Sequence, residues 1–154
     1  LFDAAADQFT PDHSPLDWAA VLLAGTSKDT PLLTLAQAEA LTREPGLLLG
    51  ALVRERRLSA EVALAEALGD VTALNGLEAV VRRRLSEPLR VQPLDWAADQ
   101  IGMAQLFRAR ARLTGVEARS VGLMLAEAME TAREMGAPAL ADRAVLAMPE
   151  AVEI

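Results

Sequence analysis

Two short runs of arginine carry the most concentrated side-chain chemistry in this sequence, one in "VRERR" and one in "VRRRL". A guanidinium group can donate two parallel hydrogen bonds to a carboxylate or a phosphate, so clustered arginines can bind an anionic partner. Arginines on helices also form ion pairs within their own chain, and such a solvated surface is the more common outcome. We predict a partner-binding surface at Arg54, Arg56, Arg57, Arg82, Arg83 and Arg84.

Side chains suited to catalysis are scarce. The chain has no cysteine and one histidine, His13, which follows Asp12 in a proline-bounded loop without a plausible nucleophile nearby. Glu127, Glu130 and Glu134 recur at helical spacing, but the Glu-x-x-His motif that helical metal sites add is missing. No glycine-rich phosphate loop occurs either. We therefore expect no enzyme, no metal site and no cofactor.

Charge and hydropathy exclude further classes of partner. The net charge of −7 opposes nonspecific attraction to nucleic acid. The segment "LLLGALVRERRLSAEVALAEALGD" predicts helix, short turn, helix, yet its second helix carries Glu61, Glu66 and Asp70 and no basic residue, so phosphates would repel it. No apolar run approaches the roughly 20 residues of a membrane span. We expect no sequence-specific nucleic acid binding and no membrane insertion.

The start of the chain bears on its location. It lacks the basic and apolar regions of a signal peptide, and the chain has no cysteine, which together predict a cytoplasmic protein. The first residue is Leu1 rather than methionine. This is typical of a piece of a longer protein or of a trimmed start.

The elements that would position these residues are helices. Hydrophobic residues make up 52% of the chain and aromatic residues 3%, and β-branched residues never form a run, which favours helix over sheet. We predict an all-α, multi-helix bundle of about six to eight helices in a single domain, residues 1–154. Proline and glycine breaks place helices at 15–24, 34–41, two within 46–70 that meet at Arg57 and Leu58 with Ser59 as cap, one within 75–89, and then 93–113, 117–134 and a short one after Pro138.

Apolar residues that recur every three or four positions predict the buried faces of these helices. In the first helix of 46–70 they are Leu48, Leu49, Leu52 and Val53. In the second they are Leu64, Ala65 and Leu68. Within 75–89 the inward residues are Leu77, Val80, Val81 and Leu85, which leaves the second arginine run outside.

The word "PLDWAA" occurs twice, at 15–20 and 93–98, and contains both tryptophans, Trp18 and Trp96. Proline suits the first position of a helix and the following aspartate suits its first turn. The simplest interpretation is a helix start used twice, in which each tryptophan anchors the first turn on the core.

A second match raises the possibility of duplication. Residues 46–65 align without gaps on residues 122–141, at an offset close to that of the repeated word. Both offsets are about half the chain, as a tandem duplication would give. Two pseudo-repeat halves, 1–76 and 77–154, are therefore an alternative organisation of the bundle.

The segment "LTLAQAEALTREPGLLLGALVRERRLSAEVALAEALG" contains a Leu-Gly pair, an apolar step, a turn leucine and a second helix that ends in Ala-Leu. These positions are Leu49, Gly50, Val53, Leu58, Leu64, Ala67 and Leu68. In this pattern the segment resembles the N-terminal helical module of type II secretion and type IV pilus assembly ATPases, and related bacterial signalling modules. The resemblance continues more weakly through "LSEPLRVQPLDW", so that it covers about residues 33–96.

The resemblance has two structural and chemical implications. In that family the stretch similar to 85–96 leaves a helix and enters a strand, which implies an alternative α+β fold with a small strand element near 89–105. Family members that bind cyclic di-GMP have arginine before the Leu-Gly pair and glycine at the turn. This chain has Leu48 and Arg57 at those positions, and Val71 where glutamine is expected.

We expect a non-catalytic helical regulatory or adaptor module that binds another protein through its helical surfaces. The resemblance implies that the partner is a component of a bacterial secretion, pilus or motility system. The alternative is a cyclic dinucleotide-binding regulatory domain, in which Arg54, Arg56 and Arg57 meet phosphates near the turn. Association of copies into a homo-oligomer is also left open.

Overall fold

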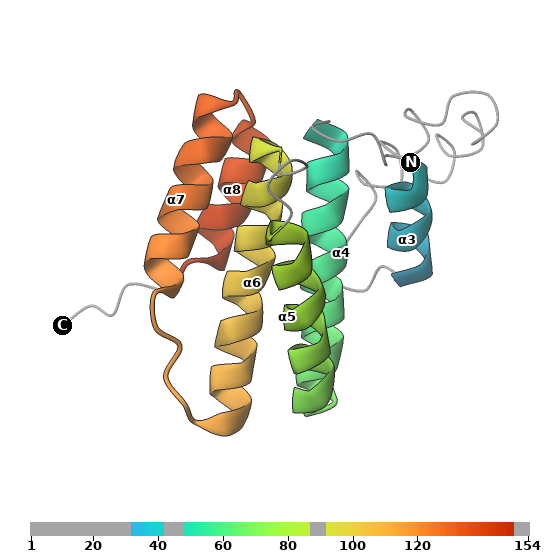
Figure 1. Ribbon diagram of the computed structural model, residues 1–154, viewed down its shortest axis with the longest axis vertical. Helices are drawn as coiled ribbons and strands as arrows, with labels where there is room; N and C mark the ends of the chain where they lie inside the picture. The colour runs from blue at the N-terminus through green and yellow to red at the C-terminus, as the bar shows by residue number, and fades with distance from the viewer. Residues whose placement is uncertain (1–31, 42–47, 87–91, 150–154) are drawn as a thin grey trace.

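The computed structural model describes residues 32–41, 48–86 and 92–149, which form six α-helices and no strand (Figure 1). From α4 onward, consecutive helices run alternately down and up (Figure 1). The predicted all-α fold is therefore confirmed. The helices are α3 (Leu32–Leu41), α4 (Leu48–Ala67), α5 (Val71–Leu85), α6 (Pro93–Thr114), α7 (Val121–Glu134) and α8 (Pro138–Ala147).

The second copy of the repeated word begins helix α6. Gln92 is extended, Pro93 takes the first helical position and Asp95 lies in the first turn, where a carboxylate faces the positive end of the helix dipole. The alternative strand near 89–105 is wrong for residues 93–105, which lie in α6. Trp96 packs against the core as predicted. The first copy, with the predicted helix at 15–24, lies outside the described residues.

Helix α4 corrects the largest error of the sequence-based prediction. It runs unbroken through Arg57 and Leu58, where we predicted a turn between two helices. No glycine or proline lies between Gly50 and Gly69, Arg57 donates to Glu61 one turn ahead at 3.0 Å, and Leu58 is buried. Helix therefore continues where nothing interrupts its hydrogen bonds.

The remaining boundaries shift at helix starts more than at helix ends. Helix α5 starts at Val71 because the Asp70 carboxylate accepts a hydrogen bond from the Ala73 N–H at 2.9 Å, an N-cap that the prediction at 75–89 missed. Helix α7 starts at Val121 instead of residue 117. The end of α6 is confirmed to within one residue, since Gly115 adopts the left-handed conformation that closes a helix.

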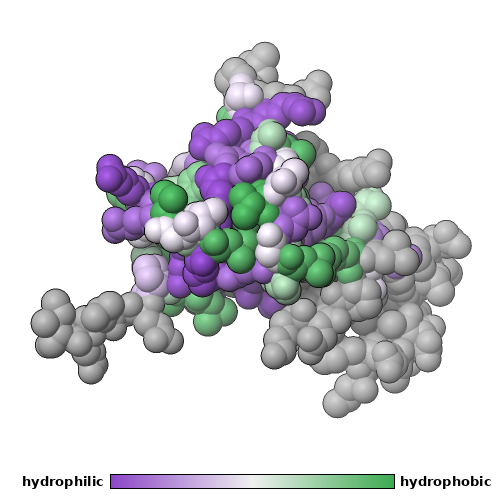
Figure 2. All heavy atoms as spheres, turned by 90° about the horizontal axis from the view of Figure 1, so that it is seen from below, coloured by the Kyte–Doolittle hydropathy of each residue, from purple (hydrophilic) through white to green (hydrophobic). Residues whose placement is uncertain are grey.

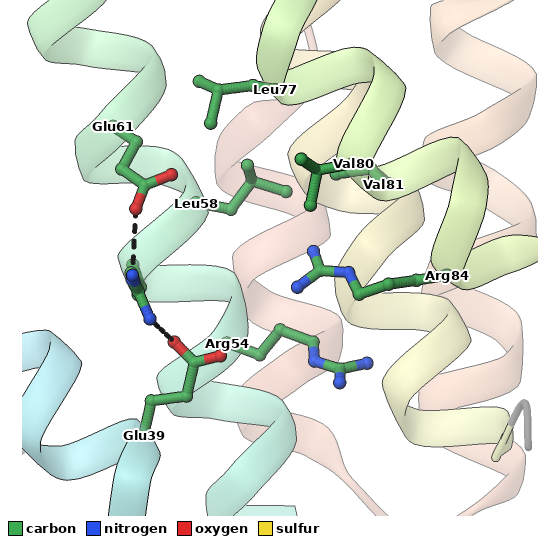
Figure 3. Close-up of a pocket in the computed structure, with 9 residues that line it drawn as sticks. Glu39, Arg54, Leu58, Glu61, Leu77, Val80, Val81 and Arg84 are labelled. Atoms are coloured by element: carbon green, nitrogen blue, oxygen red, sulfur yellow. Dashed lines mark hydrogen bonds and ion pairs between the residues drawn. The ribbon is translucent and has the colours of Figure 1, made fainter.

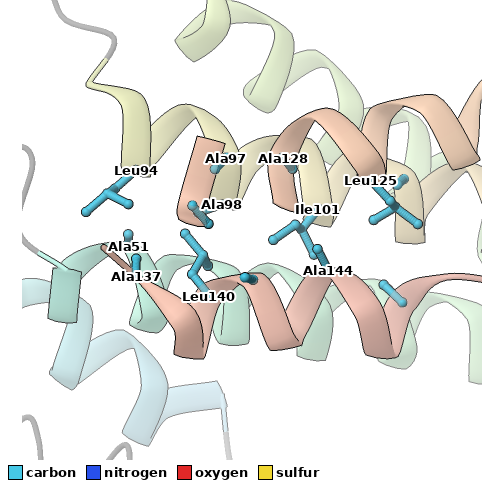
Figure 4. Packing of buried hydrophobic residues seen from close by; sticks show 14 of the residues in the cluster. Ala51, Leu94, Ala97, Ala98, Ile101, Leu125, Ala128, Ala137, Leu140 and Ala144 are labelled. Atoms are coloured by element: carbon cyan, nitrogen blue, oxygen red, sulfur yellow. The ribbon is translucent and has the colours of Figure 1, made fainter. Parts of the chain in front are cut away.

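The main core lies between α6, α7 and α8 and is rich in alanine (Figure 4). Its buried leucines and isoleucine interdigitate with alanines from the facing helices, and Ala51 of α4 closes one side. Small side chains let the helix axes approach closely, so few large residues suffice to fill the space. We call this cluster, which includes Leu94, Ile101, Leu125 and Leu140, the sealed core.

A second cluster joins α4 and α5 to the other side of α6. Its closest approach is at Gly102, where an added Cβ would lie 2.1 Å from the Cδ2 atom of Leu58. Glycine avoids a clash at this position, since a Cβ there would force the buried Leu58 side chain to shift. Helix α6 thus contributes to both clusters and forms the centre of the bundle.

The predicted boundary between two halves, at residues 76 and 77, lies inside helix α5. The sealed core also combines Ala51 with residues of α6, α7 and α8. The described residues therefore share their cores across that boundary, and the halves are not separate structural units. An ancestral duplication stays a prediction.

Candidate functional site

A surface trough follows helix α4, which forms its floor, with α3 and α5 as its walls. Helix α3 contacts α4 and no other described helix, so α3 and α5 leave the outer side of α4 open between them. Two adjoining pockets, of about 220 Å³ and about 490 Å³, occupy this gap and share Glu61, Leu77 and Val80 as lining residues. We call the two pockets together the α4 trough.

The smaller pocket is the polar end of the trough (Figure 3). Arg57 lies between two carboxylates, with Nη1 2.6 Å from Glu39 Oε2 and Nε 3.0 Å from Glu61 Oε1. The pKa of Arg57 lies above its usual value, and the main cause is its hydrogen bond to Glu39. The other two guanidiniums are those of Arg54, from the floor helix α4, and Arg84, from the wall helix α5 (Figure 3).

Arg54 and Arg84 share one buried carboxylate, that of Asp99 on α6. The Arg84 Nη2 atom lies 2.8 Å from Asp99 Oδ1, and the Arg54 Nη1 atom lies 3.5 Å from Oδ2. Burial raises the pKa of Asp99 to about 6, although Arg84 and Arg54 act to lower it. The buried Nε of Arg84 has no hydrogen-bond partner among the described residues. Asp99 therefore ties the floor helix α4 and the wall helix α5 to α6.

The larger pocket is the apolar end of the trough, lined by Leu32, Ala73 and Gly76 among others. Three apolar side chains there are strongly exposed: Leu64 at 49%, Leu68 at 72% and Val80 at 48%. The view from the lower end of the bundle shows hydrophobic side chains at the surface among hydrophilic ones (Figure 2). Exposed apolar side chains gathered in one hollow are typical of a binding surface.

This exposure corrects the prediction that Leu64, Leu68 and Val80 face inward. On α4 the positions that face α5 and α6 are already filled by Leu58, Val62 and Ala65. Leu64 precedes the buried Ala65 by one residue and therefore lies about 100° from it around the helix axis, since a helix turns by that angle per residue. It therefore points away from the core. On α5, Val81 takes the inward position instead of Val80.

The six predicted partner-binding arginines do not form one site. Arg54, Arg57 and Arg84 meet at the polar end of the trough. Arg82 is exposed, pairs with Glu78 at 2.8 Å, and lies over the ring of Phe107 at 5.9 Å. The prediction left the whole second run outside, which is wrong for Arg84 because it is half-buried against Asp99.

The remaining two arginines point elsewhere. Arg83 is exposed and has no ion pair among the described residues. Arg56 lies near Glu55 and Arg143, and its pKa is lowered by burial and by the charge of Arg143, with Glu55 acting in the opposite direction. Glu55 itself is fully buried and accepts hydrogen bonds from Arg143 at 2.6 and 3.1 Å and from Gln105 at 3.2 Å.

The other candidate side chains are a histidine and three glutamates. His13 lies outside the described residues. Glu127, Glu130 and Glu134 are exposed on α7, in agreement with a solvated acidic face. Within the ranges that the structure describes, no group of histidine, cysteine, aspartate and glutamate side chains is placed to hold a metal ion. Nor does any helix in these ranges have the length and apolar character needed to cross a membrane.

Two kinds of residue escaped the sequence analysis. The sequence contains an indication that some leucines of the trough are exposed, because apolar residues on the second half of α4 cover more than one helix face. It contains a weaker indication that the acids Glu55 and Asp99 are buried. Asp99 lies in the mostly apolar stretch "WAADQIGMA", on what became a buried helix face, and a buried acid needs a cationic partner.

No protein-family model matches this chain, and neither a curated protein nor a solved structure matches it. The functional argument therefore starts from the geometry of the α4 trough.

Proposed function

We propose that this protein is a non-catalytic adaptor or regulatory module that binds a protein partner in its α4 trough. The observation that carries the proposal is the group of exposed apolar side chains, Leu64, Leu68 and Val80, in a hollow of about 490 Å³. Full burial of one leucine or valine side chain contributes about 1.5–3 kcal/mol. Three half-exposed side chains in one hollow therefore offer a partner a substantial part of its binding free energy.

The walls of the trough support a macromolecular partner over a small substrate. At its polar end the charged side chains are paired with each other or with Asp99, so none of these is left poised as a nucleophile or general base. At its apolar end Leu64, Leu68 and Val80 stay exposed. Exposed apolar side chains beside paired charges are the usual composition of a protein interface.

The setting of this interaction comes from the sequence resemblance. The positions that resemble the helical module of pilus assembly ATPases lie on α4, with Leu68 directly after its end, although the turn at Leu58 is replaced by continuous helix. We propose a bacterial secretion, pilus or motility component as the partner, in the cytoplasm.

Ion pairing argues against the alternative of cyclic dinucleotide binding. Phosphates would have to compete with Asp99 for Arg54 and with Glu39 and Glu61 for Arg57. Calorimetric titration with cyclic di-GMP tests this alternative directly. Heat that saturates at micromolar ligand would favour the nucleotide over the protein partner.

The proposed function is tested with a charge placed in the trough. The variant Leu64→Lys with Val80→Lys changes two exposed side chains, so the fold should be retained. Crosslinking from a bacterial lysate and reconstitution with the purified candidate should show binding to the native protein that this variant loses. Leu123→Lys, at a 62% exposed position on α7, is the matched control. Equal binding by all three proteins would refute the proposal.

A further inference from the structure

The apolar end of the α4 trough lies where the first described helix begins. Leu32, the first residue of α3, lines this pocket, so the preceding part of the chain is attached at the rim of the hollow. The charged side chains of the polar end are paired with one another or with Asp99. The side chains that stay exposed are Leu64, Leu68 and Val80. The hollow therefore suits an apolar occupant, and the segment before Leu32 is tethered beside it.

The repeated word "PLDWAA" shows which helix face such a segment can present. In α6 the second copy begins a stripe of four apolar residues that the sealed core covers (Figure 4): Leu94, Ala97, Ala98 and Ile101. Their spacing, i, i+3, i+4 and i+7, is that of one helix face. The first copy begins a stripe with apolar residues at the four matching positions: Leu16, Ala19, Ala20 and Leu23. The same stripe is covered by other helices in the copy that the structure describes.

The connection between the first stripe and α3 is short enough to keep the stripe at the trough. Residues 25–31, from Gly25 to Pro31, join the predicted helix at 15–24 to Leu32. These seven residues span at most about 25 Å when extended, whereas Leu64 and Leu68 are about 6 Å apart along α4. The stripe can therefore reach the apolar end. A tether of this length holds it there at an effective concentration of about millimolar, which favours it over a second copy.

We propose that residues 15–24 form a helix whose apolar stripe docks on Leu64, Leu68 and Val80, so that the chain covers its own trough until a protein partner displaces it. The contact itself needs no partner, whereas its role as an autoinhibitory cover rests on the proposed function. A helix this short is marginal by itself. It therefore detaches in a local step and adds little to the global free energy of unfolding. The partner binds the detached form.

Methyl NMR on the full chain tests the contact. Overhauser effects should join the two leucines of the stripe, Leu16 and Leu23, to the exposed methyl groups of the trough. In a mixture of two differently isotope-labelled preparations, these effects should arise within one chain. Effects that arise only between chains would assign the trough to a second copy and overturn the inference. The absence of any effect from Leu16 and Leu23 to the trough would overturn it as well.

Two full-chain variants separate the stripe from the rest of the segment. Leu16→Lys with Leu23→Lys should shift the methyl resonances of the three exposed apolar side chains of the trough, because the docked leucines are lost. Leu22→Lys is the matched control, since it lies off the stripe, at the position that the half-buried Gln100 occupies in α6. Unchanged Leu140 methyls report that the sealed core is retained. Equal shifts in both variants, or none in either, would overturn the contact.

The affinity of a reconstituted partner tests the regulatory role. The Leu16→Lys, Leu23→Lys variant should bind the partner about fivefold more tightly, since no fraction of it is held in the covered form. The Leu64→Lys, Val80→Lys variant should still lose binding. Unchanged affinity in the first variant would remove the autoinhibitory role and leave the proposed function intact. Overhauser effects at the trough without partner binding to either the native protein or the first variant would remove the proposed function and leave the contact.

Discussion

The side of α4 that faces α6 and the side that faces the trough use the same apolar residue types with opposite results. Toward α6, Leu58 packs against Gly102 and is buried. Toward the trough, Leu64 and Leu68 stay exposed because α3 and α5 do not meet over them. The comparison shows that leucine on a helix becomes core only where a second helix lies within side-chain reach. Among the described residues, the side of α4 between α3 and α5 is therefore left uncovered.

The same change from leucine to alanine should have the largest and most unequal effects in the sealed core, on α8, and at the trough. Leu140→Ala in the sealed core should lower the free energy of unfolding by about 2–5 kcal/mol, because it loses buried area and leaves a cavity. Leu68→Ala at the trough should change it by about 0.5 kcal/mol or less. Urea unfolding of both variants measures the difference. Equal losses would mean that the trough is covered in solution.

Asp99 of α6, which pairs with Arg54 on α4 and Arg84 on α5, should make the bundle more stable as the pH falls from about 6 toward 4. Burial raises the pKa of Asp99 from 3.8 to about 6, so the folded protein takes up a proton between about pH 6 and pH 4 that the unfolded chain does not. Stability then rises as the pH falls through this window, by up to roughly 3 kcal/mol. Urea unfolding at a series of pH values measures this slope.

The Asp99→Asn variant should flatten the slope between about pH 4 and pH 6, whereas Glu127→Gln at an exposed position should leave it unchanged. The pKa values of Glu66 and Glu78 are lowered: the hydrogen bond from Arg112 lowers that of Glu66, and for Glu78 the bonds from Arg110 and Arg82 outweigh the raising effect of burial. Their effect has the opposite sign and develops as the pH falls below the ordinary glutamate pKa of 4.5. An unchanged slope in Asp99→Asn would assign the pH response to another group.

The closest contact on the covered side should be intolerant of a single methyl group. Gly102→Ala places a Cβ within the volume of Leu58 and should cost about 1–3 kcal/mol through overpacking. The double variant Gly102→Ala with Leu58→Ala should lose less than the sum of the two single losses, because the clash is gone. Additive losses in thermal or urea unfolding would contradict this account of the α4–α6 contact.

The smallest effect is expected for the same substitution on the wall of the trough. Gly76 lies inside α5, and an added Cβ meets no atom within 4 Å. Gly76→Ala should therefore stabilise the protein by about 0.5–1 kcal/mol through helix propensity alone. Calorimetric unfolding reads this as a rise in Tm. A loss of stability would show that the wall is packed against something at Gly76.

Composition and local pattern determined the fold class and many helix ends in the described residues. Alanine and leucine at helical spacing, without β-branched runs, predicted an all-α bundle, and Pro93 and Gly115 predicted the ends of α6. These preferences act within one turn of helix, so they can be predicted from the local sequence. The predicted turn at Arg57 and Leu58, with Ser59 as cap, was wrong, because no local residue there interrupts the helix.

Tertiary structure alone decided which apolar and charged side chains are covered. Sequence spacing grouped Leu64 with Ala65, yet Ala65 is buried in the cluster of α4, α5 and α6 while Leu64 is exposed. Sequence spacing also left Arg84 outside with Arg82 and Arg83, yet Arg84 pairs with the buried Asp99 of α6. Likewise, Glu55 and Asp99 are buried only because arginines far along the chain reach them. Burial depends on how neighbouring helices are placed around each face, and that arrangement is a property of the assembled bundle, which no window of the sequence contains.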